Sequence, residues 1–230
     1  SLLKGLEITL YLSLLSVGIG FILAMIYALL ELSRFKIIRY PATLFVTLVR
    51  SLPELVVIFL IGLGIPYLYY LGVDYNLPLI ADFHQSYLER FRREFEFSDF
   101  LLGAVALSLI YASYASQTLR GALLAVPKSQ WDSGAVLGLS KVGTFFYIIL
   151  PQMMRHAFPG LGNQWLVLLK DTALIALLGV HELMEGTRKV YATTGQGFTW
   201  FFIAALLYLG VSMVSQYLQA YFYKRITHYD

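Results

Sequence analysis

Four ionisable side chains interrupt otherwise apolar stretches of the sequence: Arg50, Glu54, Lys170 and Asp171. A charged side chain at the centre of a membrane-spanning helix costs about 2.5–3.5 kcal/mol on insertion scales, so unpaired placement against lipid is unfavourable. Arg50 and Glu54 are four residues apart, which places them on one helical face where they can form an ion pair. The alternative is that such groups line a translocation path and bind a charged solute. Both interpretations are open at this point.

Three amide side chains lie in the same apolar stretches: Gln117, Asn163 and Gln164. In a membrane, amides commonly form hydrogen bonds between neighbouring helices. They can also face a translocation path, so bridging and path-lining roles are both carried forward.

The elements that must position these residues are membrane spans. The 230 residues include only 17 Lys and Arg and 14 Asp and Glu, so 13% are charged, against about 25% in soluble domains. Hydrophobic residues make up 58%, and the mean hydropathy is +0.68. One soluble core cannot bury that much apolar surface, and the absence of cysteine excludes a disulfide scaffold. The net charge of +3 requires no nucleic acid, since membrane proteins concentrate Lys and Arg in cytoplasmic loops.

Five apolar runs approach or exceed the roughly 20 residues that a spanning helix needs. We expect an all-α integral membrane protein in which residues 1–230 form a single transmembrane domain. Pro41 is expected in the first turn of the second span, where its missing N–H is tolerated. The apolar stretch 146–180 suits one span followed by a broken or re-entrant piece. The five spans are predicted at about 5–31, 41–71, 100–124, 146–170 and 198–222.

The distribution of basic residues predicts the orientation. An odd number of spans puts the two termini on opposite sides of the membrane. Segments 31–40, 120–156 and 224–230 carry nine Lys and Arg, against six in the opposite segments. The positive-inside rule therefore favours an external N-terminus and a cytoplasmic C-terminus. The loop at about 72–99, which holds six acidic residues, would then be external.

A short helix is predicted in the cytoplasmic loop at about 125–145. Pro127 ends the preceding helix, and the side chain of Ser129 or Asp132 can cap a new one by accepting a hydrogen bond from a free amide. Gly138 can end it in a left-handed conformation. This pattern alone fits any amphipathic interfacial helix.

The spacing around this helix resembles the EAA loop of ABC-importer permeases. Asp132, Ser133 and Gly134 stand where the family has Glu-Ala-Ala. Gly138 follows six residues after the acid, and an Ile-x-Leu-Pro motif ends at Pro151, nineteen residues after it. The chain departs from the pattern at Gln117, where many relatives carry glutamate, and in the acidic 72–99 insertion. The flanking motifs Tyr114–Gly121, Val126–Trp131, Pro159–Gln164 and Leu169–Thr172 resemble the polar amino acid branch of the family, histidine/arginine type.

The resemblance implies a type I ABC importer permease fold in the bacterial inner membrane, with a periplasmic N-terminus and a cytoplasmic coupling helix. It implies four kinds of partner: a second permease subunit (identical or different), two cytosolic ATPase subunits, a periplasmic amino-acid-binding protein and the amino-acid substrate. Asp132 would face a basic residue or helix end on the ATPase, Gly134 would permit close approach, and Gly138 would fix the helix angle.

No enzymatic activity is expected of this chain. It lacks the G-x-x-x-x-G-K-S/T phosphate loop, so ATP and Mg²⁺ are expected in the partner ATPase and no cofactor in this subunit. The motif that begins at His181 and Glu182 lacks the second histidine of H-E-x-x-H, so no metal site is expected. The acidic loop would dock the binding protein or simply be solvated.

The resemblance also implies a basic amino acid, most simply arginine, as the substrate, with histidine or another polar amino acid as the alternative. Arginine carries a guanidinium and an α-ammonium, which carboxylates such as Glu54 or Asp171 can bind, and an α-carboxylate, which Arg50 can bind. The path residues expected are Arg50, Glu54, Gln117, Asn163, Lys170 and Asp171.

Three other functions are weighed against this one. A channel or secondary transporter would also explain buried charges, but the sequence shows no internal repeat or pore motif. An intramembrane enzyme would need a motif such as G-x-S-x-G or paired aspartates, and neither is present. A scaffold subunit without a role in transport is the third alternative.

Overall fold

The computed structural model describes residues 2–91 and 98–227, which are almost entirely helical. Five of the helical segments are long and apolar enough to cross a membrane: Leu2–Glu31, Glu54–Asp74, Asp99–Ala125, Lys141–Leu178 and Gly197–Arg225. The expected all-α membrane fold with five spans is therefore confirmed. The elements are α1 (Leu2–Glu31), α2 (Lys36–Ser51), α3 (Glu54–Gly62), α4 (Gly64–Asp74), α5 (Pro78–Phe91), α6 (Asp99–Ala125), α7 (Ser129–Val136), α8 (Lys141–Thr144), η1 (Phe145–Ile149, a π-helix), α9 (Leu150–Asp171), η2 (Thr172–Leu178, a 3-10 helix), α10 (Leu183–Thr194) and α11 (Gly197–Thr227).

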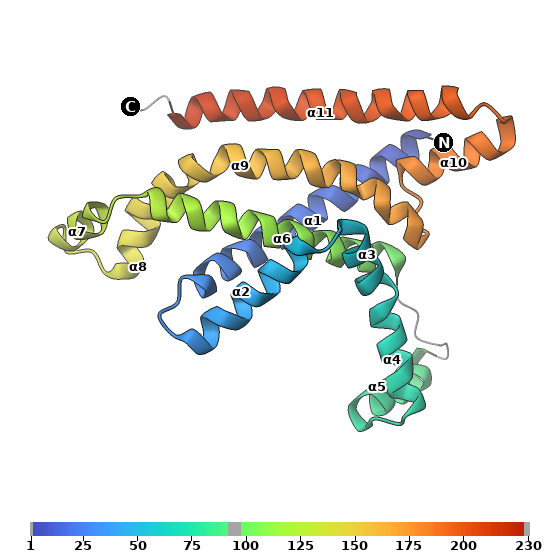
Figure 1. The fold of residues 1–230 in the computed structure, drawn as a ribbon, viewed down its shortest axis with the longest axis horizontal. Helices are drawn as coiled ribbons and strands as arrows, with labels where there is room; N and C mark the ends of the chain where they lie inside the picture. The colour runs from blue at the N-terminus through green and yellow to red at the C-terminus, as the bar shows by residue number, and fades with distance from the viewer. Residues whose placement is uncertain (1, 92–97, 228–230) are drawn as a thin grey trace.

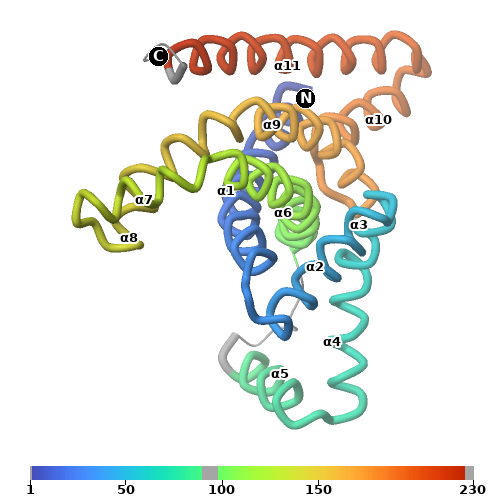
Figure 2. Tube along the Cα trace, turned by 60° about the vertical axis from the view of Figure 1, so that its left-hand side comes forward, coloured from blue at the N-terminus to red at the C-terminus, as the bar shows by residue number. Residues whose placement is uncertain are grey.

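Helix α6 forms the centre of the bundle and contacts α1, α3 and α9 (Figure 1). Helices α7 and α8 extend beyond one end, and the α4–α5 hairpin projects sideways near the other (Figure 2). Helix α11 lies outermost, along α9 and α10, and is largely exposed. The N-terminal end of α1 and the C-terminal end of α11 lie toward opposite ends of the bundle (Figure 1).

Small residues let α1 and α6 approach closely. The hydroxyl of Ser16 donates a hydrogen bond to the carbonyl of Ala104 at 3.3 Å. A Cβ on Gly20 would lie 2.8 Å from the carbonyl oxygen of Ser108, so only glycine fits there without a shift. In a membrane the hydrophobic effect does not drive helices together, because lipid is as apolar as the helix surfaces. Small residues are therefore the usual means of close helix packing.

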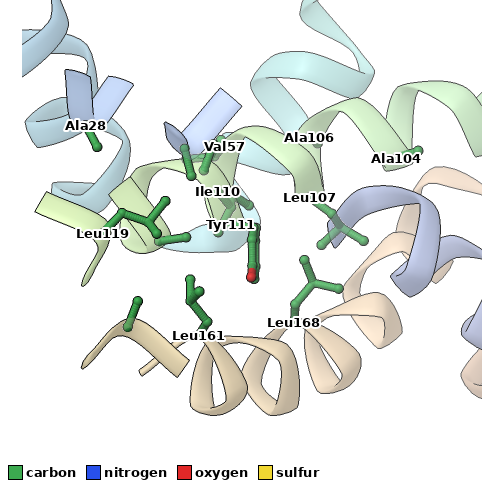
Figure 3. Packing of buried hydrophobic residues seen from close by; sticks show 14 of the residues in the cluster. Ala28, Val57, Ala104, Ala106, Leu107, Ile110, Tyr111, Leu119, Leu161 and Leu168 are labelled. Carbon is green, nitrogen blue, oxygen red and sulfur yellow. The ribbon is translucent and has the colours of Figure 1, made fainter. Parts of the chain in front are cut away.

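Aliphatic side chains from α6 and α9 close the core. Figure 3 shows Leu107 and Leu119 on α6 facing the side of α9 that carries Leu161 and Leu168. Tyr111 stands between the two helices with its hydroxyl pointing toward α9 (Figure 3). A polar group thus reaches into a mostly apolar layer, and it marks the position of the site described below.

The second predicted span is wrong as a single helix over 41–71. Helix α2 already begins at Lys36, so Pro41 lies inside it and not in its first turn. It ends at Ser51, because Pro53 has no N–H to continue the helix and holds Leu52 in an extended conformation (φ −89°, ψ 147°). The apolar span that follows begins at Glu54 and bends at Leu63, between α3 and α4.

The 72–99 segment is more ordered than the loop expected there. It contains α5, which folds back along α4, and the hydroxyl of Tyr69 on α4 lies 2.9 Å from Nδ1 of His84 on α5. Glu94 and Glu96, counted among the acids of this segment, lie outside the described residues.

The fourth span has irregular helix at both of its ends. The π-helix η1 precedes α9, and Pro151 is the second residue of α9. Asp171 ends α9, and seven residues of 3-10 helix follow, closed by Gly179 at φ +95°. The irregular piece expected after this span is therefore η2, wound more tightly than an α-helix.

Candidate functional site

A cavity of about 210 Å³ lies between α3, α6 and α9. Its wall combines two carboxylates, two tyrosines and an amide with aliphatic side chains. The lining residues are Glu54, Leu107, Ile110, Tyr111, Tyr114, Gln164, Val167, Leu168 and Asp171. Two of the predicted path residues, Glu54 and Asp171, are thus brought together from positions more than a hundred residues apart.

Glu54 is placed by the helix break that precedes it. It is the first residue of α3, directly after Pro53, and an acid at a helix N-terminus is favoured by the helix dipole. Its side chain is half-buried, and the hydroxyl of Tyr114 donates a hydrogen bond to Oε1 at 3.3 Å. One hydroxyl leaves most of the acceptor capacity of this carboxylate unused.

Asp171 ends α9 on the opposite wall of the cavity. The residue is half-buried, and its carboxylate forms no hydrogen bond or ion pair with any described residue. Glu54 is close enough to repel it electrostatically, and Lys170 is close enough to attract it. Two carboxylates share one cavity without a cation between them, an arrangement that a positively charged ligand would stabilise.

Arg50 lies beside this cavity and is not one of its lining residues. Its guanidinium stands over the ring of Tyr114, 5.4 Å from the ring centroid. Of the two interpretations left open for Arg50 and Glu54, the ion pair does not form: within the described ranges no ion pair joins them. The expected helical face does not exist, because α2 ends at Ser51 and α3 begins only at Glu54.

The other predicted path residues lie outside the cavity. Gln117 donates a hydrogen bond from Nε2 to Oε2 of Glu31 and so bridges α6 and α1. Asn163 and Lys170 are exposed on α9 and do not line the cavity, whereas the neighbouring Gln164 does. Gln117 thus forms the interhelical bridge considered for the amides, and Gln164 faces the cavity.

Sequence reasoning missed the two tyrosines of the cavity wall. Tyr111 and Tyr114 are one helical turn apart in the middle of α6, far from both ends of that span. Tyrosines usually sit at the membrane interfaces. A pair at mid-span is therefore the signal that could have identified them as polar groups serving an internal site.

The predicted helix of the 125–145 segment is α7, and its end is built as expected. Gly138 adopts φ +76°. Its N–H donates to the carbonyl of Ala135, and the N–H of Leu139 donates to that of Gly134, both at 3.0 Å. This is the double hydrogen bond of a glycine C-cap, which fixes the direction in which the chain leaves the helix.

The start of α7 differs from expectation. Neither Ser129 nor Asp132 caps it: the N-cap is Lys128, already helical and without a side-chain cap. The carbonyl of Pro127 accepts the first hydrogen bond, from the N–H of Gln130, so the turn starts without a capping hydroxyl. Asp132 and Ser133 are exposed, and the Ser133 hydroxyl donates to the carbonyl of Ser129 at 2.9 Å.

Gly134 permits a close approach within the chain itself. It is buried, and a Cβ there would lie 2.8 Å from the Cβ of Thr144 on α8. The Trp131 and Phe145 rings stack with centroids 6.3 Å apart. These contacts fasten α7 to the segment that continues through Pro151 into α9, so α7 is joined to the helix that carries Asp171.

The tip formed by α7 and α8 is apolar and exposed. Val136 is 87% exposed, Leu137 72% and Val142 67%. A cluster of large apolar side chains on a projecting tip is characteristic of a surface that binds another protein.

A helical bundle with an acidic internal cavity and a projecting, glycine-capped helix has the construction of the membrane subunit of a transporter. The family model described as "binding-protein-dependent transport system inner membrane component" matches residues 16–228, and the chain belongs to this family.

Individual relatives agree with this assignment. The arginine ABC transporter permease protein ArtQ of Escherichia coli K12 is 44% identical over 212 residues, which cover 92% of this chain and 89% of the relative. ArtQ of Haemophilus influenzae is 48% identical and covers 90% and 85%. A solved structure titled "Crystal structure of an amino acid ABC transporter with histidines" is 25% identical, with a TM-score of 0.77, covering 97% of this chain and 93% of that chain. The resemblance to the polar amino acid branch, histidine/arginine type, is confirmed, and within this branch the chain is similar to the Q-type permease subunit of the bacterial arginine transporter.

Proposed function

We propose that the chain is the permease subunit of an ATP-driven importer and that its substrate is arginine. The observation that carries the proposal is the cavity in which Glu54 and Asp171 meet without a cation. The names of the two ArtQ relatives supply the substrate. A guanidinium can donate to both oxygens of a carboxylate in a planar, bidentate geometry, so an arginine side chain suits either acid.

The rest of the cavity can orient the same substrate. Arg50, beside Tyr114, supplies a cation for the α-carboxylate, and the amide of Gln164 can donate to or accept from the α-amino acid group. Aliphatic side chains such as Leu107 and Val167 suit the methylene groups of arginine. Asn163 and Lys170, exposed on the same helix, would lie along the route to or from this cavity.

Coupling to ATP hydrolysis is assigned to the exposed tip of α7 and α8. In this proposal a cytosolic ATPase, which binds ATP and Mg²⁺, holds Val136, Leu137 and Val142 in an apolar groove and meets Asp132 with a basic group. The permease itself carries no cofactor and is not catalytic. The stacking of Trp131 on Phe145 then carries the motion of α7 into α9.

The assembly contains a second permease subunit, identical or different, two ATPases and a periplasmic binding protein. The end that bears α7 also lies toward the C-terminal end of α11 (Figure 1), which supports a cytoplasmic C-terminus and a periplasmic N-terminus in the bacterial inner membrane. The acidic α4–α5 hairpin is then the candidate contact for the binding protein.

Histidine is the second candidate substrate. The solved amino acid transporter that this chain resembles is titled "with histidines". An imidazolium is also a cation that a carboxylate can bind, but it presents two N–H donors where a guanidinium presents five.

The experiment replaces Glu54 by Gln in the transporter assembled with its ATPase and binding protein in proteoliposomes. We expect the arginine concentration that half-saturates the cavity to rise about tenfold to a hundredfold, since a hydrogen bond to a charged group contributes about 1.5–3 kcal/mol. Glu7→Gln, which alters an exposed glutamate of α1, is the matched control and should transport like the parent. Unchanged arginine dependence in Glu54→Gln would remove Glu54 from the site.

A further inference from the structure

The α4–α5 hairpin lies across the bundle. Both views show α4 running across the direction of α11, near the end of the bundle opposite α7 and α8 (Figure 1, Figure 2). Glu54–Asp74 has the composition of a span, but the bend at Leu63 turns its second half, α4, aside. Helices α4 and α5 have 11 and 14 residues, about 16 and 21 Å at 1.5 Å per residue, short of a hydrocarbon core of about 30 Å. Neither helix of the hairpin therefore crosses a membrane by itself.

Exposed apolar side chains continue from α3 onto α4 across this bend. Leu60, Leu63 and Tyr67 are exposed, and their spacing of three and four residues places them on one face. They border an open groove of about 460 Å³. The groove is lined by Val56, Phe59, Leu60, Leu63, Gly64 and Tyr67. The phenol oxygen of Tyr67 is the one polar atom among these side chains, so the groove suits a hydrocarbon chain.

Helix α5 has an apolar edge and an acidic edge. Leu79 is 88% exposed and Phe83, one turn later, 51%. Asp82 and Glu89 are also exposed and share a second face, about a quarter of a turn around the helix from the first. The remaining side packs on α4, where His84 meets Tyr69. A helix with separate apolar and charged faces is suited to the boundary between lipid and water.

We propose that the α4–α5 hairpin lies flat in the surface of the membrane and binds lipid. Leu79, Phe83 and the α3–α4 groove contact the acyl chains, while Asp82 and Glu89 face the water. The second crossing is then made by α2 and α3, whose 16 and 9 residues extend up to about 37 Å. The number of crossings stays at five.

The acidic edge favours lipid over a protein partner for the apolar edge. The centre of a protein interface is depleted of charged residues, because a carboxylate covered without a partner is costly. A protein seated on Leu79 and Phe83 would have to cover or closely border Asp82. At a membrane surface the same carboxylate stays hydrated. Tyr67 agrees with this placement, since tyrosine is enriched where lipid meets water.

The identity of the leaflet is a separate matter from the contact with lipid. Naming the leaflet periplasmic rests on the proposed coupling role of α7, which lies at the other end of the bundle (Figure 1). The contact with lipid rests on the direction of α4, the groove and the two edges of α5. The acids left in water remain available to the periplasmic binding protein.

The depth of single nitroxide labels tests the proposal. The sequence contains no cysteine, so labels can be placed at Leu79→Cys and Asp82→Cys, three residues apart, without removing native thiols. Leu206→Cys, at an exposed leucine of α11, is the standard for lipid. Each variant is assembled with its ATPase in phosphatidylcholine proteoliposomes, and collisions of the label with oxygen and with a water-soluble nickel chelate are measured. We expect the oxygen-to-nickel ratio at position 79 to match that at 206 and to exceed that at 82 about tenfold or more, because a polar chelate is excluded from an apolar layer.

Two results would overturn the proposal. Equal ratios at positions 79 and 82 would place the whole of α5 in water. Few collisions with either reagent at position 79 would mean that a protein, the second permease subunit or the binding protein, covers the apolar edge. The measurement requires neither arginine nor ATP. Failure of the cavity assignment, seen as unchanged arginine dependence in Glu54→Gln, is therefore distinguishable from failure of this inference.

Discussion

The molecule treats its buried acids in two different ways. Glu182 is fully enclosed, and three donors from α1, α10 and α11 use its oxygens. Glu54 and Asp171 are only half-buried and share a cavity. Among the described residues, Glu54 accepts one side-chain hydrogen bond, from Tyr114, and Asp171 accepts none. The first site is complete without a ligand, whereas the second has acceptor capacity to spare.

This difference distinguishes a carboxylate that stabilises helix packing from carboxylates that can bind a cation. A carboxylate that is already satisfied gains nothing from a passing cation, and its removal leaves several donors without an acceptor. A pair of carboxylates that repel each other gains a great deal from a cation and costs the fold little when one is neutralised. Substitutions at the two sites should therefore move different observables.

Asp171→Asn should affect the substrate most strongly. It removes a carboxylate that forms no ion pair with any described residue. We therefore expect the arginine concentration at half-maximal uptake to rise about a hundredfold. The Tm of the purified subunit should be unchanged or higher, because repulsion with Glu54 is relieved. Titrating arginine against uptake and ATPase rate measures the first effect. Asp82→Asn, at an exposed acid of α5, is the control.

Glu182→Ala should show the opposite pattern in stability. Tyr208, Thr9 and the N–H of Glu185 lose their acceptor, and we expect the subunit to be destabilised by about 2–3 kcal/mol. Thermal unfolding in detergent, followed by tryptophan fluorescence, measures this change. If Glu182→Ala unfolds at the temperature of the parent, or Asp171→Asn unfolds below it, the division between the two acids is contradicted.

A smaller effect concerns pH. Burial raises the pKa of Glu182 above its ordinary value, and hydrogen bonds from Tyr208, Thr9 and the backbone oppose the shift. The folded state thus holds the proton more tightly than the unfolded state. The contribution of Glu182 to the free energy of unfolding is therefore fully present below the ordinary pKa of about 4.5. It is lost as pH rises through the pKa of the folded state.

Glu182→Gln cannot titrate and should lack this loss. Between about pH 4 and pH 7 the Tm of the parent should therefore fall by about one or two degrees relative to that of Glu182→Gln. The comparison cancels the other titrating groups, which both proteins share. Parallel pH profiles for the two would show that the hydrogen bonds fully offset burial.

The tip formed by α7 and α8 could be predicted from sequence because its geometry is local. Gly138 sits at a left-handed C-cap whose partners, Ala135 and Gly134, are within four residues, so spacing alone defines the geometry. The wrong detail there is also local: Pro127 offers a carbonyl that starts α7, which leaves Ser129 with no capping role.

The cavity could be predicted only in part, because its residues come from three helices. The cost of burying charge singled out Glu54 and Asp171, but no spacing rule relates α3 to α9. The Arg50–Glu54 pair, one of two interpretations open from the sequence, does not form because a proline two residues from a helix end removed the shared face. The sequence left Gln117 between a bridging and a path-lining role, because its partner, Glu31, lies 86 residues away on α1, beyond the reach of any local pattern.

The 3-10 winding of η2 sets a length scale for movement. Seven residues rise about 14 Å at 2.0 Å per residue in a 3-10 helix and about 10.5 Å at 1.5 Å per residue in an α-helix. Rewinding this one segment would draw α10 about 3.5 Å toward Asp171 without unfolding a single turn.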